Sequence, residues 1–166
     1  MPDLIVPGSI WLALACFVAA QAGFRRAGGS RRAIWALSAY WIGFALALAH
    51  FLAAFHWHYG WSHARAVAAT AEQTARVFGV NWGGGVWVNY AFLAAWLGDA
   101  AVRTTYPARA GATPSAGTWS LRAFYLIVIA NGAITFARWP MSLVGVALVA
   151  ALIWSWRPPV ARGVRS

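Results

Sequence analysis

The sequence predicts an all-α integral membrane protein, a helical bundle of about five transmembrane helices with an amphipathic interfacial helix between spans two and three. The composition supports this fold class, because 61% of the residues are hydrophobic and only 10% are charged, whereas soluble domains carry about 25% charged residues. Apolar runs long enough to cross about 30 Å of hydrocarbon recur along the chain. Short arginine blocks separate them. With 166 residues, the chain is expected to form a single membrane domain.

The first two apolar segments, residues 5–24 and 33–57, are predicted to be spans. Arginines follow the first segment at once and mark residues 25–32 as a cytoplasmic loop. A cleaved signal peptide is the alternative for this segment, since Ala20 and Ala22 resemble the small residues of a cleavage site. Signal peptides carry their positive charge before the apolar stretch, however, and here it comes after. The second segment contains no Asp, Glu, Lys or Arg.

Residues 58–85 are expected to form a periplasmic segment that contains the amphipathic helix. Ser62 is suited to cap the start of this helix, and Gly79 to end it in the left-handed conformation. Small apolar residues at three- and four-residue steps define the face expected to pack on the bundle: Ala64, Val67, Ala68, Ala71, Ala75 and Phe78. The other face is polar: Arg65, Thr70, Glu72, Gln73, Thr74 and Arg76. Such a helix is expected to lie along the outer interface or fold onto the bundle.

Three further spans are predicted at residues 86–102, 121–137 and 141–156. The segment 103–120 between the first two is rich in Gly, Pro, Thr and Ser and is expected to be a cytoplasmic loop. Residues 121–156 would reach about 54 Å as one helix, too long for one crossing. Arg138 and Pro140 divide them, because a mid-bilayer arginine is costly and proline lacks the amide hydrogen of a helix interior.

The arginines predict the orientation in the membrane. Ten of the thirteen fall in segments on one side of the predicted spans, and only Arg65, Arg76 and Arg138 fall on the other. Positive residues concentrate in cytoplasmic loops. We therefore expect a bacterial cytoplasmic (inner) membrane protein with a periplasmic amino terminus and a cytoplasmic carboxy terminus. The net charge of +10 does not indicate nucleic-acid binding, because the basic residues lie in short blocks between apolar runs.

All four histidines fall within fourteen positions, at His50, His56, His58 and His63. Imidazole binds copper, zinc and haem iron, so His56, His58 and His63 are candidate metal ligands, with Met141 as a soft ligand predicted at the same face. His56 and His58 point about 200° apart on one helix, so they converge only if the helix ends between them. The alternative is that these histidines anchor the interface as the neighbouring tryptophans do. A haem held by two histidines of one chain is not expected, since no other span contains a histidine, but a haem held by His50 and Met141 or shared between subunits stays open.

A second candidate site combines His50, Asn89 and Asn131, which are all predicted in the outer half of the membrane. Polar groups inside a membrane are costly unless they pair within the bundle. The three side chains are therefore expected to form one cluster that binds a cofactor or ligand. The alternative is that they only hold helices together by hydrogen bonds.

Two functions are compatible with this sequence. The first is a non-catalytic subunit or scaffold of a larger membrane complex, for example a redox complex, whose partners are the lipid bilayer and other subunits or a second copy of itself. The second is a metal- or haem-binding membrane protein that uses the periplasmic histidines. The chain has only three acidic residues and no carboxylate pair for glycoside chemistry. Whether it is an enzyme is left open.

Overall fold

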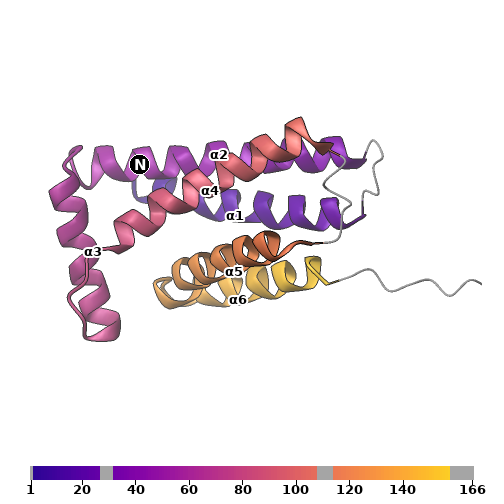
Figure 1. Ribbon diagram of the computed structural model, residues 1–166. Coiled ribbons are helices and arrows are strands. Elements are labelled where there is room, and N and C mark those ends of the chain that lie inside the picture. Colours follow the sequence, from indigo (N-terminus) through magenta and orange to yellow (C-terminus); the bar gives the residue numbers. More distant parts are fainter. Residues whose placement is uncertain (1, 27–31, 108–113, 158–166) are drawn as a thin grey trace, which may run out of the picture.

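The computed structural model describes residues 2–26, 32–107 and 114–157, and this part of the chain is helical without strands (Figure 1). The all-α prediction is confirmed. In chain order the elements are α1 (Pro2–Arg26), α2 (Arg32–Trp57), α3 (His63–Phe78), α4 (Gly85–Thr105), α5 (Ala116–Ala130), the π-helical turn η2 (Asn131–Thr135) and α6 (Met141–Ser155).

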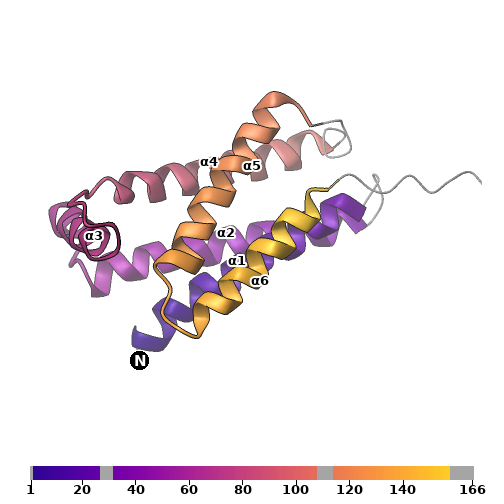
Figure 2. The same ribbon diagram turned by 90° about the horizontal axis from the view of Figure 1, so that it is seen from below.

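Five of the helices run lengthwise, and α3 lies across one end of them (Figure 1). Helices α1 and α2 form a long antiparallel hairpin, with α4 beside α2, while α5 and α6 form a second antiparallel pair (Figures 1 and 2). We call the end covered by α3 the α3 end. The opposite end is called the arginine end, because Arg25, Arg103, Arg122 and Arg157 lie there, near the termini of their helices.

Two helices contain segments long and apolar enough to cross a membrane, Gly8–Arg25 in α1 and Ile34–Trp57 in α2. Their mean hydropathies are 1.3 and 1.6. Helix α6 is apolar but contains only 15 residues. The helix bounds differ from the predicted spans: α1 and α4 exceed residues 5–24 and 86–102 at both ends, and the expected span at 121–137 is replaced by α5 and η2.

Aromatic side chains fill the centre of the bundle. Phe17 of α1 lies within 4.8–5.5 Å, centroid to centroid, of the rings of Tyr40, Trp96 and Tyr125. These four rings come from α1, α2, α4 and α5 and are fully or almost fully buried. Tilted and edge-to-face pairs of this kind add about 0.5–1.5 kcal/mol each beyond the burial of their area. They therefore join the two helical pairs into one core.

Helix α3 has the predicted boundaries but is rotated, so that only part of the predicted face contacts the bundle. Ser62 caps its start by accepting a hydrogen bond from the Arg65 amide, and Gly79 ends it with φ of 72°. The face that contacts the bundle carries Ala66, Thr70 and Thr74 together with Val67 and Phe78 of the expected face, whereas Ala64 and Ala68 are exposed. Alanines bury little apolar area, so the fit to the neighbouring backbone decides the rotation of the helix.

Candidate functional site

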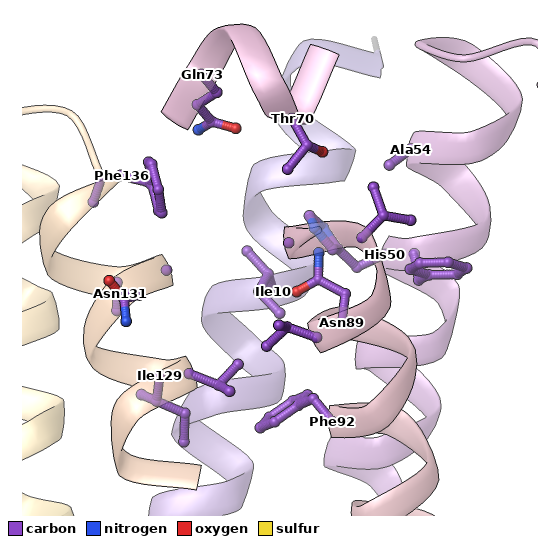
Figure 3. A pocket seen from close by; sticks show the side chains of 18 of the residues that line it. Ile10, His50, Ala54, Thr70, Gln73, Asn89, Phe92, Ile129, Asn131 and Phe136 are labelled. Atoms are coloured by element: carbon purple, nitrogen blue, oxygen red, sulfur yellow. The ribbon is translucent and has the colours of Figure 1, made fainter. Parts of the chain in front are cut away.

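A cavity of about 1110 Å³ lies at the α3 end, between α3 and the long helices (Figure 3). All six α-helices and η2 contribute to its wall. Most of the wall is apolar and includes Ile10, Ala54, Phe92, Ile129 and Phe136. Such a cavity exceeds the common range of about 300–1,000 Å³ for small-molecule sites. It can hold a large, mainly apolar molecule.

A few polar groups interrupt this apolar wall, and they include all three residues of the predicted His50, Asn89 and Asn131 cluster. Asn89 on α4 and Asn131 on η2 lie on opposite walls (Figure 3). The Asn131 Nδ2 donates to the Ile127 carbonyl of its own helix at 2.9 Å, and His50 Nδ1 lies 3.4 Å from the Ser9 hydroxyl oxygen. The residues thus share one cavity, while their binding of a cofactor stays a prediction.

Asn131 also begins the π-helical turn, which sequence reasoning missed. The Phe136 amide donates to the Asn131 carbonyl at 2.9 Å, five residues back. A π-helical turn adds one residue to a turn of helix, and such turns occur frequently at functional sites. Here η2 contributes Asn131, Gly132 and Ala133 to the cavity wall. No residue pattern in this segment distinguishes it from an ordinary helix.

Helix α3 covers the cavity with its polar face. Thr70, Gln73 and Thr74 line the cavity from this side. The loop before α4 approaches α3 closely, since a Cβ added at Gly83 would lie 2.6 Å from the Val67 carbonyl oxygen, and one at Gly85 would lie 2.8 Å from the Thr70 methyl carbon. Both glycines allow the two segments to approach closely. They let α3 form a tightly packed cover.

The other histidines point to separate partners. His56 Nδ1 accepts a hydrogen bond from the Trp61 indole at 3.2 Å, and the exposed His58 contacts the Tyr59 ring edge-on. His63 stacks on Tyr90, with ring planes 18° apart. Among residues 2–26, 32–107 and 114–157, no three His, Cys, Asp or Glu side chains are grouped so that they could hold a metal ion. The fourth expected ligand, Met141, lines the cavity together with His50.

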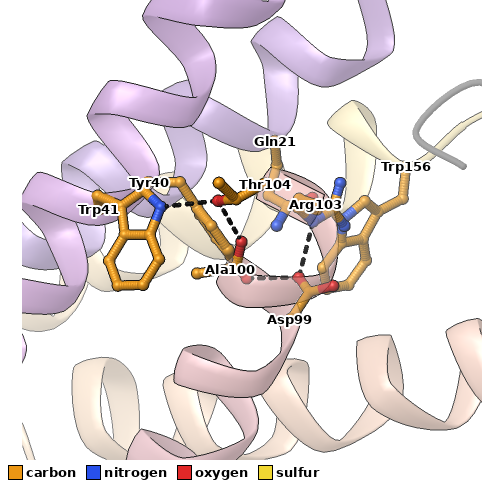
Figure 4. Close-up of polar contacts among 8 residues, drawn as sticks. All are labelled: Gln21, Tyr40, Trp41, Asp99, Ala100, Arg103, Thr104 and Trp156. Carbon is orange, nitrogen blue, oxygen red and sulfur yellow. Dashed lines mark hydrogen bonds and ion pairs between the residues drawn. The ribbon is translucent and has the colours of Figure 1, made fainter. Parts of the chain in front are cut away.

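The arginine end holds a polar network that joins three helices (Figure 4). Asp99 Oδ2 of α4 accepts from the Tyr40 hydroxyl of α2 at 2.7 Å and from Arg103 Nε at 2.8 Å. The Arg103 guanidinium lies 4.4 Å from the centre of the Phe24 ring of α1. The spacing of Asp99 and Arg103 predicts their salt bridge, which the structure confirms. The role of Tyr40 was missed, because its pairing joins positions 59 residues apart.

Comparison of the chain with known proteins gives no function for either end, since no protein-family model, curated protein or solved structure matches it.

Proposed function

We propose that this protein is a membrane-embedded bundle with five crossings, formed by α1, α2, α4, α5 with η2, and α6. Two segments have the length and apolarity of a span. The 21 residues of α4 reach about 31 Å as a helix, close to the thickness of the hydrocarbon. Large apolar side chains on α6 are exposed, namely Leu143, Val144, Val146, Ile153 and Trp154. Lipid is the solvent that accommodates a surface of this kind.

The distribution of charge supports the same arrangement. Arginines gather at one end of the long helices, and the α3 end carries Arg65, Arg76 and Arg138. This asymmetry favours a cytoplasmic arginine end and a periplasmic α3 end in a bacterial inner membrane. Helix α3 would then lie at the outer surface and cover a cavity in the outer half of the bilayer.

We further propose that the α3-end cavity binds an amphipathic molecule, with a long apolar body and a polar group that forms hydrogen bonds. The observation that carries this function is the cavity itself, about 1110 Å³ of mainly apolar wall with the amides of Asn89 and Asn131 and the imidazole of His50. An apolar wall with few polar groups binds the body of a ligand by burial and orients its polar group by hydrogen bonds. Such a ligand would enter from the bilayer and needs no acid–base residues.

Mass spectrometry of the purified protein tests this function. The full chain in mild detergent should retain one amphipathic molecule per chain, released by organic extraction and identified by its mass. Ala54→Trp should displace it, because Ala54 lines the cavity. Ala49→Trp is the matched control, as Ala49 is exposed on the same helix. Equal retention by both folded variants, or no retained molecule in the unmodified protein after lipid extracts are added back, would exclude this function.

The second candidate function is the non-catalytic subunit or scaffold. The exposed apolar surface of α6 favours it, since a partner helix could cover the same residues as lipid does. Crosslinking in intact membranes separates the two candidates: a partner would crosslink to α6 at one defined mass, whereas lipid alone gives no protein adduct. The metal- or haem-binding alternative stays a prediction from the sequence. The separate orientations of His56, His58 and His63 give it no support.

A further inference from the structure

A second cavity, of about 590 Å³, lies at the arginine end between α4, α5 and the end of α6. Its wall carries more charged residues than that of the α3-end cavity, namely Asp99, Arg103 and Arg122 against Arg138 alone. Two arginines against one carboxylate leave the wall with an excess of one positive charge. Asp99 and Arg103 already pair with each other. The charge that remains without a counterion in this wall is therefore that of Arg122.

Arg122 is held in place but lacks a hydrogen-bond acceptor at one nitrogen. Its guanidinium carbon lies 5.0 Å from the centre of the Trp119 ring and 5.6 Å from that of Trp156. The Nη1 atom is buried and has no hydrogen-bond partner. A buried guanidinium donor without an acceptor costs more than about 1–3 kcal/mol. An anion in the cavity would remove this cost.

Tyr125, one turn further along α5, supplies a second donor. Its side chain is 2% exposed and lines the same cavity, and its hydroxyl is also buried without a hydrogen-bond partner. The start of α5 adds Ser115, Gly117 and Thr118 to the wall. The Thr118 amide there already donates to the Ser115 hydroxyl oxygen at 3.3 Å. The donors available to an anion in this cavity are therefore the Arg122 guanidinium and the Tyr125 hydroxyl.

We propose that the arginine-end cavity binds a phosphate group, with Arg122 as its principal ligand and the Tyr125 hydroxyl as a second donor. The phosphate can be that of a lipid headgroup at the membrane surface or a free phosphate ion. Both sources present the same oxygens to Arg122. This site is separate from the α3-end cavity, and neither proposal depends on the other.

Lipid titrations of the full chain in detergent test the site. Dioleoylphosphatidylglycerol should raise the melting temperature in a saturable manner, and dioleoylglycerol, which lacks the phosphate, should not. Inorganic phosphate is tested in a second titration. A higher melting temperature with phosphate at millimolar concentration assigns the site to the free ion, and a higher melting temperature with the phospholipid alone assigns it to a lipid headgroup. If dioleoylglycerol stabilises the protein as much as the phospholipid, or if neither phosphate source does, the proposal is wrong.

Variants of two arginines locate the binding. Arg122→Gln should weaken phosphate binding about tenfold or more, the loss expected for one charge-assisted hydrogen bond. Arg157→Gln removes the same charge from an exposed position at the same end, outside the cavity wall, and should leave the affinity within about twofold. Equal losses would indicate non-specific attraction to a basic surface and overturn the site. If Arg122→Gln does not fold, the comparison of dioleoylphosphatidylglycerol with dioleoylglycerol on the unmodified protein still tests whether the site binds phosphate.

Discussion

Gly145 of α6 packs directly against the backbone carbonyl of Ala133 in η2, so that a Cβ at position 145 would overlap the Ala133 carbonyl oxygen. Both residues are buried. The contact places α6 against the π-helical turn, whose other side lines the α3-end cavity. Close packing at one glycine therefore fixes the position of the segment that carries Asn131.

Gly145→Ala should destabilise the protein by about 2 kcal/mol or more, because α6 must move away from η2 to make room for the methyl group. The thermal midpoint in detergent measures this. Gly98→Ala in α4 is the control, since a Cβ there would meet no atom within 4 Å. Alanine favours a helix over glycine by up to about 1 kcal/mol, so the control should be neutral or more stable. A neutral result for Gly145→Ala would contradict the close contact.

Asp99→Asn should destabilise the bundle by about 2 kcal/mol, because it removes the charge that accepts hydrogen bonds from Tyr40 and Arg103. Glu72→Gln on α3 makes the same chemical change at an exposed site and should cost less than about 0.5 kcal/mol. Both values come from unfolding curves in detergent. Similar losses for the two variants would mean that the Asp99 network contributes no more than a surface charge.

His63→Ala should loosen α3 without unfolding the long helices. His63 stacks on Tyr90, lies 5.0 Å from the Trp87 ring centre, and has its Nδ1 atom 3.1 Å from the Tyr90 hydroxyl. These contacts connect the start of α3 to α4, and their loss should cost about 1 kcal/mol. Hydrogen exchange of the α3 amides should become faster, while His58→Ala leaves it unchanged. Unchanged exchange in the first variant would show that His63 does not hold α3.

The sequence was sufficient to predict the ends of α3 and the break before α6, because local chemistry determines them. Ser62 and Gly79 form the caps that their residue types favour, and the break at residues 138–140 follows from Pro140. The rotation of α3 was not predictable from its own periodicity. It depends on Gly83 and Gly85, which contact Val67 and Thr70 from another segment.

The candidate sites show the same division between local and long-range information. His50, Asn89 and Asn131 were expected to lie near one another because of their similar depth in the predicted spans. They do line one cavity. Proximity in sequence suggested convergence of His56, His58 and His63, whereas in the structure each ring contacts its own aromatic partner. The donors of Arg122 and Tyr125 have no sequence signal, since an arginine at the start of a predicted span equally resembles a cytoplasmic charge.

Cysteine labelling in intact cells tests the proposed crossings, with Cys16→Ala as the background because Cys16 is the only native cysteine. Glu72→Cys and Arg138→Cys, both exposed at the α3 end, should react with a membrane-impermeant maleimide from outside. Arg157→Cys at the arginine end should react only after the cells are opened, since the proposed crossings place the arginine end on the cytoplasmic side and the α3 end outside. Labelling at 72 with protection at 138 would mean that α5 and η2 do not cross the bilayer. Labelling at 157 in intact cells would reverse the orientation derived from the arginines.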